Sequence, residues 1–128
     1  MPSASELQSL ANAVGWAGSN EKPPAGIPQT AVAHTVIAEN KTTGEVIGCA
    51  FLLTDNAGFY YIKNVIVQPS WQGQRIGTAL VKHLDDWLKE HAPTDSTVAL
   101  HTGPNLAPFY RQFGFFPAFS MQKKMLRD

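Results

Sequence analysis

The chain has 128 residues, of which 44% are hydrophobic, and its ten basic side chains are balanced by ten acidic ones. This length predicts a single globular domain, residues 1–128, with one hydrophobic core. We expect no nucleic acid and no membrane as partner, because the chain lacks the positive field that attracts either. No apolar run is long enough to span a bilayer and the first residues lack a signal-peptide pattern, so we expect a cytoplasmic protein.

The first predicted element is a helix at about residues 5–14. Ser3 and Glu6 have the spacing of a capping box, and leucine, alanine and valine follow at helical intervals. Residues 16–29 contain three prolines and two glycines, which is typical of a loop. A loop of this length either carries function or only connects two elements, and the sequence favours neither alternative.

Three strands are predicted next, at residues 30–39, 45–53 and 59–67, because each range is rich in β-branched or aromatic residues. Short turns with polar residues and glycine separate them, so neighbouring strands should pair antiparallel. The only cysteine, Cys49, falls in the second strand. We expect it to be a small buried side chain rather than a nucleophile.

The third strand should end at Pro69, which lacks a backbone donor, and a long helix should begin near Gln74. The apolar residues of this helix recur at spacings of three and four and therefore share one face. They are Ile76, Leu80, Leu84, Trp87 and Leu88. Charged residues take the opposite face, where Asp85 and Lys89 have the favourable four-residue spacing.

The turn between this strand and this helix, residues 72–78, is the first candidate site. The first turn of a helix presents backbone N–H groups that have no acceptor within the helix. Gly73 and Gly77 carry no side chain that would block a ligand, so a phosphate could bind there with help from the helix dipole. Arg75 could add a charge-assisted contact. Two glycines are equally typical of an ordinary tight turn.

Beyond the long helix, the sequence predicts a short strand at residues 97–101. Asn105 is then placed to cap a short helix, which Gly114 would end. A last strand is predicted at residues 116–126. The domain would therefore finish with a strand, a helix and a strand.

The strand end and the turn together resemble a known family. The segments VIVQP (residues 65–69) and QGQRIGTAL (residues 72–80) resemble the acyl-CoA diphosphate loop of the GCN5-related N-acetyltransferases, or GNAT superfamily. The family pattern is Q/R-x-x-G-x-G/A after a V-x-V-x-P strand end. In the alignment that we prefer, Gln72 opens the pattern, Gly77 closes it and Arg75 stands where the family usually has glycine. In the alternative alignment, Gln74 opens it.

The segment NLAPFYRQFGF, residues 105–115, resembles the family's second cofactor segment, a short helix followed by an aromatic Gly-Phe. The resemblance covers residues 30–126 and implies an α+β fold in α/β/α layers. The sheet would be mixed, mostly antiparallel and splayed between strands 59–67 and 97–101, with flanking helices. Only Met1 and Pro2 precede the predicted first helix, so we expect the family's strand before that helix to be missing. Strand 30–39 would then be a bare apolar edge, and we expect a homodimer that covers it.

The resemblance implies an acetyl-CoA-dependent N-acetyltransferase that acetylates a primary amine of a small molecule by direct attack. Backbone groups of Val65, Ile66 and Val67 would orient the pantetheine arm of the cofactor. A second set would hold its diphosphate: Gln72, Gly73, Gln74, Arg75, Ile76, Gly77 and Thr78. Asn105 would lie near the cofactor arm. Tyr110 would contact the cofactor and protonate the departing sulfur, a role that suits a phenol because it is protonated at neutral pH.

The general base is not defined by the resemblance. Strand 59–67 has no carboxylate, and Asn64 stands where related sequences often carry an acid. His101 could accept the proton, since histidine titrates near neutral pH, although a histidine at a strand end is often structural. Trp16, Tyr61 and Asn64 are the candidate contacts for the acceptor amine. No cluster of histidine, cysteine and acidic residues predicts a metal.

Two other functions are compatible with parts of the sequence. The missing strand and the lack of an obvious base favour a non-catalytic acyl-CoA-binding sensor or interaction module. A nucleotide-binding P-loop or Rossmann unit is disfavoured, because no Gly-Lys-Ser/Thr follows the loop and the full G-x-G-x-x-G is absent.

Overall fold

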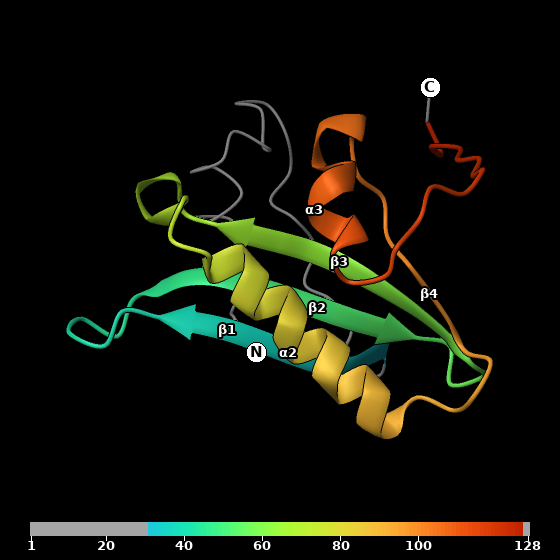
Figure 1. Ribbon diagram of the computed structural model, residues 1–128, viewed down its shortest axis with the longest axis horizontal. Coiled ribbons are helices and arrows are strands. Elements are labelled where there is room, and N and C mark those ends of the chain that lie inside the picture. Colours follow the sequence, from blue (N-terminus) through green and yellow to red (C-terminus); the bar gives the residue numbers. More distant parts are fainter. Residues whose placement is uncertain (1–30, 127–128) are drawn as a thin grey trace.

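The computed structural model describes residues 31–126, which form one open four-stranded sheet with two α-helices (Figure 1). The strands, in their order across the sheet, are β1 (Val32–Glu39), β2 (Val46–Thr54), β3 (Phe59–Val67) and β4 (Thr97–Ala99). β1 pairs antiparallel with β2, β2 antiparallel with β3, and β3 parallel with β4. The predicted mixed, mostly antiparallel fold is confirmed. The helix predicted at residues 5–14, the loop after it and the question of a strand before that helix lie outside the described residues.

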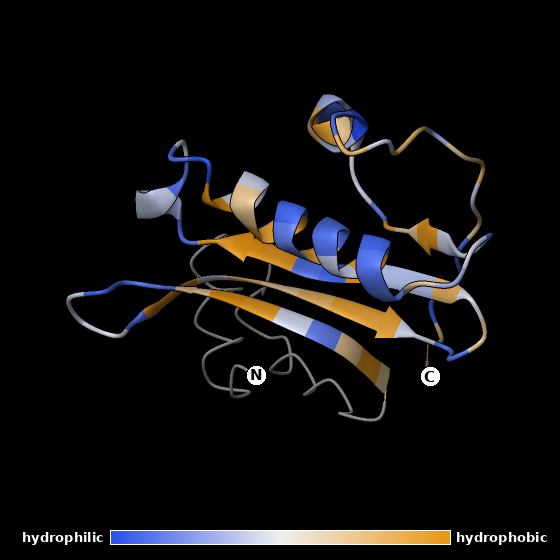
Figure 2. Cartoon of the chain, turned by 60° about the horizontal axis from the view of Figure 1, so that its bottom comes forward, coloured by the Kyte–Doolittle hydropathy of each residue, from blue (hydrophilic) through white to orange (hydrophobic). Residues whose placement is uncertain are grey.

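Helix α2 (Ile76–His91) packs on one face of the sheet because its apolar residues form a single stripe. The buried members of the stripe are Leu80, Val81, Leu84 and Leu88. Figure 2 shows hydrophilic residues on the outer side of α2 and hydrophobic residues along the strands. On that outer side Lys89 and Asp85 form the predicted pair, with N and O atoms 2.9 Å apart. Within residues 31–126, no helix is both long enough and apolar enough to cross a membrane.

β3 contains one extra residue where it passes β2. Asn64 and Val65 together lie opposite Ala50, because the register shifts by one between the flanking pairs. This is a β-bulge, and Asn64 adopts a left-handed φ of 56°, which asparagine tolerates better than most side chains. The bulge reverses the alternation of the strand, so that Ile62 and Val65 both pack in the core on the α2 side.

β3 and β4 stay paired for only three residues, from Phe59 opposite Thr97 to Tyr61 opposite Ala99. Beyond Tyr61, no described residue pairs with β3 on that side. Figure 1 shows β4 leading away from β3 toward α3 (Ala107–Arg111). The sheet is therefore splayed between the two strands for which the splay was predicted, and one backbone edge of β3 is left open there.

One strand prediction near the C-terminus is wrong, and another strand is present but shorter than predicted. Residues 116–126 form no strand, because a strand needs a neighbour to complete its hydrogen bonds and no described strand pairs with them. Pro117 also removes one donor near the start of the segment. The strand predicted at residues 97–101 stops at Ala99, since β3 has diverged from it by that point.

Candidate functional site

The segment between β3 and α2 is fixed to the end of the sheet. The N–H of Gln68 donates to the carbonyl of Ile47 at 2.8 Å, and its side-chain amide donates to the Glu45 carboxylate at 2.9 Å. A 3-10 turn at Pro69–Trp71 follows. The Gln72 side chain then donates to the carbonyl of Val67 at 3.0 Å. The loop therefore leaves the sheet in a defined direction and delivers the chain to the start of α2.

The first turn of α2 presents unpaired backbone donors. The first backbone hydrogen bond at this end runs from the N–H of Ala79 to the carbonyl of Arg75 at 3.1 Å. The N–H groups of Ile76, Gly77 and Thr78 have no acceptor among residues 31–126, and the N-cap side chain supplies none. Their dipoles point the same way as the helix dipole, so the site favours an anion.

The two predicted glycines have different roles here. Gly73 has a left-handed φ of 83°, and a β-carbon there would have nothing within 4 Å, so the loop is open on this side. A β-carbon on Gly77 would meet Phe109 Cζ at 3.8 Å and Val67 Cγ2 at 3.9 Å. Gly77 therefore lies between the end of β3 and helix α3. The backbone N–H groups without acceptors lie next to this open loop, and such an arrangement suits the diphosphate of the expected cofactor.

Arg75, the N-cap of α2, also adopts a left-handed conformation, with φ 62°. A side chain in this region crowds the backbone and costs roughly 1–2 kcal/mol. Glycine avoids that cost, which explains why a glycine would be usual at this position of the pattern. The geometry supports the alignment in which Gln72 opens the loop, and the Arg75 residue is exposed there.

Replacing Arg75 separates backbone strain from charge. Arg75→Gly is expected to raise the free energy of unfolding by roughly 0.5–1 kcal/mol, since the relief of strain exceeds the entropy that glycine adds to the unfolded chain. Arg75→Gln keeps the strain and should give no gain. Both should weaken coenzyme A binding about fivefold, because both remove the cation. Urea denaturation and calorimetry measure the two quantities, and equal stability of the two variants would contradict the strain argument.

The end of β3 offers a ligand its backbone rather than its side chains. Ile66 is 3% exposed and packs with Cys49 and Phe51, whereas Val65 and Val67 pack on the α2 side. Cys49 donates from its thiol to the carbonyl of Asn64 at 3.5 Å, and burial raises the pKa of this thiol to about 12. The prediction that Cys49 is a buried side chain is confirmed.

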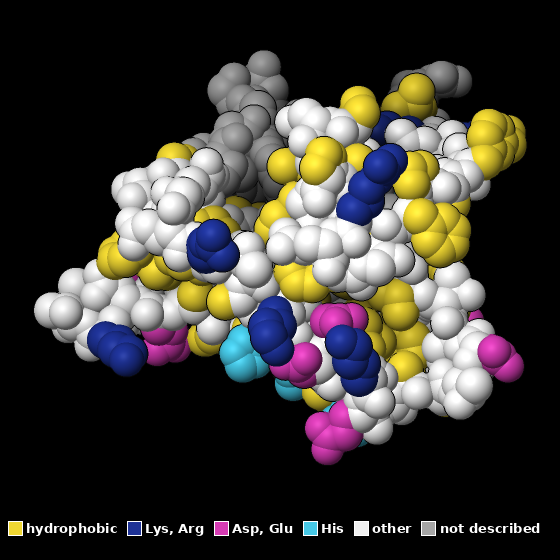
Figure 3. Space-filling view, in the orientation of Figure 1, with side chains coloured by type: hydrophobic (Ala, Val, Ile, Leu, Met, Phe, Trp, Pro, Cys, Tyr) yellow, Lys and Arg dark blue, Asp and Glu magenta, His cyan; other side chains and the backbone are white. Residues whose placement is uncertain are grey.

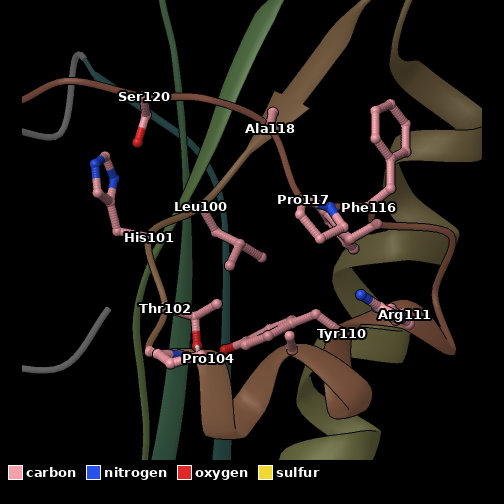
Figure 4. Close-up of a pocket in the computed structure, with 13 residues that line it drawn as sticks. Leu100, His101, Thr102, Pro104, Tyr110, Arg111, Phe116, Pro117, Ala118 and Ser120 are labelled. Atoms are coloured by element: carbon pink, nitrogen blue, oxygen red, sulfur yellow. Dashed lines mark hydrogen bonds between the residues drawn. The ribbon is translucent and has the colours of Figure 1, made fainter.

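A pocket of about 510 Å³ lies between the end of β4, helix α3 and the C-terminal segment (Figure 4). It brings together the two residues predicted as acid and base, Tyr110 and His101. Most of the other lining side chains are apolar. They include Leu100, Pro104, Ala107, Phe115, Phe116, Pro117 and Ala118. An apolar pocket with a few polar groups is the usual form of a small-molecule site.

Tyr110 is 9% exposed and packs edge to face against Phe109 and Phe115. Its hydroxyl has no hydrogen-bond partner among the described residues, and it points toward the end of the pocket where Thr102 and Pro104 lie (Figure 4). Burial raises the pKa of Tyr110 above its ordinary value of 10, so the phenol keeps its proton at neutral pH. A buried O–H without an acceptor is available to a ligand.

His101 follows β4 and is exposed on one side of the same pocket. Its Nδ1 shares a hydrogen bond with the hydroxyl of Tyr61 from β3. The bond joins Tyr61, the last paired residue of β3, to a residue two positions beyond Ala99, the last paired residue of β4. Two of the predicted substrate and catalytic residues, Tyr61 and His101, are thereby in contact, whereas Trp16 lies outside the described residues.

Asn105 does not cap the short helix as predicted. The proline at position 104 has the φ that a helical turn requires, and a 3-10 turn therefore begins two residues earlier than predicted, at Pro104–Leu106, with Asn105 inside it. Helix α3 then begins at Ala107 without a side-chain cap. The Asn105 side chain turns back toward Gly103, and its amide oxygen lies 2.8 Å from the point that a β-carbon on Gly103 would occupy.

Sequence reasoning missed Phe109 and Thr102. Phe109 contacts the β-carbon position of Gly77 and so brings α3 to the start of α2, while Thr102 lines the pocket near the Tyr110 hydroxyl. The helical spacing of Phe109 in the predicted short helix gave no sign of this contact. Within residues 31–126, no group of three or more histidine, cysteine or acidic side chains could hold a metal; His34 and His91 stack on Trp87 instead.

Comparison with known proteins gives consistent results. The family model described as an acetyltransferase (GNAT) domain matches residues 31–117. The uncharacterized N-acetyltransferase ycf52 of Porphyra purpurea is 27% identical over 111 residues, which are 86% of this chain and 63% of that relative. Its counterpart in Gracilaria tenuistipitata is 27% identical over 112 residues, or 60% of its length. The chain therefore spans less than two thirds of these curated relatives.

Solved structures of other proteins have the same fold. A Staphylococcus aureus protein of unknown function, described as a probable acetyltransferase, superposes with a TM-score of 0.77 and 21% identity, covering 97% of this chain and 94% of that one. A GNAT family acetyltransferase of Streptococcus pneumoniae gives a TM-score of 0.73 and 23% identity, covering 100% and 94%. At this identity the comparison shows the shared fold.

Proposed function

This chain belongs to the acetyltransferase (GNAT) family, and we propose that it transfers an acetyl group from acetyl-CoA to a primary amine of a small molecule. Acetyltransferases of this family use acetyl-CoA as donor. The observation that carries the proposal is the row of unpaired N–H groups at the start of α2, beside the splayed edge of β3 and the buried phenol of Tyr110.

The chain would hold the donor at two places. Acetyl-CoA, when bound, supplies a reactive thioester and a diphosphate. The N–H groups of Ile76, Gly77 and Thr78 bind the diphosphate, with Arg75 as a neighbouring cation. The unpaired backbone of β3 beyond the bulge binds the pantetheine arm. Holding both reactants in place can contribute about 7–11 kcal/mol to lowering the barrier.

Tyr110 acts as the general acid in this proposal. It donates its proton to the departing thiolate sulfur while the amine forms its bond to the acetyl carbon. Three observations support the role: the hydroxyl is buried, its pKa is raised so that it stays protonated, and no described residue accepts its hydrogen bond. A positioned acid typically contributes about 10²–10⁴ in rate.

His101 accepts the proton that the attacking amine loses. When its Nδ1–H donates to the Tyr61 oxygen, Nε2 keeps a lone pair that can take the proton. The 13 pocket-lining residues include no carboxylate, which favours a small amine with an apolar body over a polycation. Tyr61 and Asn64, and Trp16 beyond the described residues, remain the predicted contacts of the amine.

A thiol-release assay with acetyl-CoA tests the proposed function. The panel consists of small aromatic and aliphatic amines, polyamines, amino acids, aminoglycosides and peptides. We expect release of coenzyme A with at least one small amine, and weak or no release with the polyamines. Heat of acetyl-CoA binding without release by any amine would instead support the non-catalytic sensor, for which the lack of a carboxylate in β3 is the favouring observation. Neither binding nor release would overturn both functions.

A further inference from the structure

The charges of this chain are unevenly distributed along its sequence. Over the whole chain ten basic residues balance ten acidic ones, yet residues 96–126 contain one arginine and two lysines and no aspartate or glutamate. All 13 residues that line the pocket belong to this acid-free segment. On the face drawn in Figure 3, Lys and Arg side chains lie around α3, whereas Asp and Glu side chains gather over α2. The pocket therefore lies in a locally positive part of a neutral chain, and such a field attracts an anion.

Arg111 brings a positive charge to the pocket itself. It is the only lysine, arginine, aspartate or glutamate among the lining residues. It forms no ion pair with residues 31–126, in which the two ion pairs join lysines and aspartates of α2. Phe116 and Pro117 line the same side of the pocket (Figure 4). A guanidinium beside apolar walls attracts an anion more strongly than one surrounded by water, because the local dielectric constant is lower.

The pocket has two polar ends and an apolar middle. Figure 4 shows His101 and the hydroxyl of Tyr110 toward one side of the pocket and Arg111 on the opposite side. The side chain of Leu100 and the ring of Tyr110 lie between them. The amine must bind at the end where the proposed acid and base lie, so the cation is left for another part of the same molecule.

We propose, on the basis of the acetyl transfer proposed above, that the acceptor amine also carries a carboxylate and that Arg111 binds this carboxylate. The planar guanidinium presents paired N–H donors that match the two oxygens of a carboxylate. A phosphate carries nearly two charges and would draw on further cations, but the described lining residues include no second arginine and no lysine. Because Arg111 and His101 lie at opposite ends, an apolar spacer must separate the carboxylate from the amine.

Two acceptors that differ in charge test this substrate class in the thiol-release assay. They are para-(aminomethyl)benzoate and its neutral amide, para-(aminomethyl)benzamide, which have the same shape and the same primary amine. We expect kcat/KM to be at least about tenfold higher for the benzoate, mainly through KM, because the carboxylate lies away from the reacting atoms. Phenylalanine, whose amine adjoins its carboxylate, should be a poor acceptor. Equal rates with benzoate and benzamide, or a clear preference for the matching phosphonate, would overturn the proposal.

Replacing Arg111 tests whether this side chain causes the preference. Arg111→Gln keeps most of the stem and removes the charge, so the ratio of kcat/KM for benzoate and benzamide should fall to about one. Arg111→Lys should restore part of the ratio, because the charge returns without the paired donors. Lys41→Gln, in the exposed turn between β1 and β2, is the control and should keep the wild-type ratio. A ratio that survives Arg111→Gln would contradict the proposal. So would a loss of coenzyme A affinity in Arg111→Gln as large as in Arg75→Gln, since the cation would then serve the cofactor.

Calorimetry distinguishes failure of the carboxylate site from failure of acetyl transfer. With coenzyme A present, the wild type should bind the benzoate at least about tenfold more tightly than the benzamide, and Arg111→Gln should bind the two alike. Binding that depends on Arg111 without any thiol release from acetyl-CoA would overturn the transfer and support the carboxylate site. Acetylation of the two acceptors at equal rates would support the transfer and overturn the carboxylate site.

Discussion

Tyr110→Phe is expected to lower kcat for acetyl transfer by about 100-fold, because it removes the proton that the departing sulfur takes up. The ring and its packing against Phe109 and Phe115 remain, so the KM for acetyl-CoA should change little. The measurement is the thiol-release assay with the best amine found in the panel. The residual rate of the variant should be limited by departure of an unprotonated thiolate.

Tyr60→Phe is the matched control for Tyr110→Phe. Tyr60 is also buried, at 8% exposure, but it packs near Trp87 in the core on the α2 side and does not line the pocket. Loss of the same hydroxyl there should leave kcat within about twofold of wild type, because no reacting atom is near it. Because burial raises the pKa of Tyr110, its phenol should lose the proton only above pH 10, and the wild-type rate should fall only there. A Tyr110→Phe variant as fast as Tyr60→Phe would remove Tyr110 from the mechanism.

Thr78→Asp is expected to weaken coenzyme A binding by about 100-fold, or about 3 kcal/mol, while leaving the protein as stable or more stable. The third residue of α2 is a favourable place for a carboxylate, which interacts with the helix dipole and is worth about 0.3–1 kcal/mol. The same carboxylate repels a diphosphate and competes for its N–H donors. Affinity and stability should therefore move in opposite directions, as measured by calorimetry and by urea denaturation.

Two further variants isolate the charge. Thr78→Asn has the size and shape of Thr78→Asp without the charge, and it should lose much less affinity. Asn56→Asp adds the same charge at the β2–β3 turn, where position 56 has a φ of 60° that both side chains tolerate. It should bind coenzyme A like wild type. Loss of affinity with Thr78→Asn as large as with Thr78→Asp would point to shape rather than anion binding.

Local sequence patterns were enough to predict the first three strands, the long helix α2 and the segment that connects β3 to α2. Turn residues at positions 40–44 and 55–58 bound the strands, and β3 was predicted with its observed limits, Phe59–Val67. The apolar stripe of α2 depends only on helical periodicity. These elements pack with their immediate neighbours, so local preference and tertiary structure agree.

The features that sequence reasoning missed depend on contacts between elements. The bulge at Asn64 appears only when the registers of β2 and β3 are known, and the left-handed φ of Arg75 follows from the path of the loop. The short helix begins differently because Pro104 starts a turn before it. The predicted last strand has suitable side chains but no neighbour among the described residues. Its prediction failed because the segment has no strand to pair with among the described residues.

Nuclear magnetic resonance of the amide groups tests most directly whether the start of α2 binds coenzyme A. The ¹⁵N-labelled chain is titrated with coenzyme A, and each backbone N–H reports on its own hydrogen bond. We predict that the amides of residues 73–78 shift most and become protected from exchange, because they have no acceptor among the described residues. No shift at millimolar coenzyme A, or largest shifts on another part of the chain, would contradict this account.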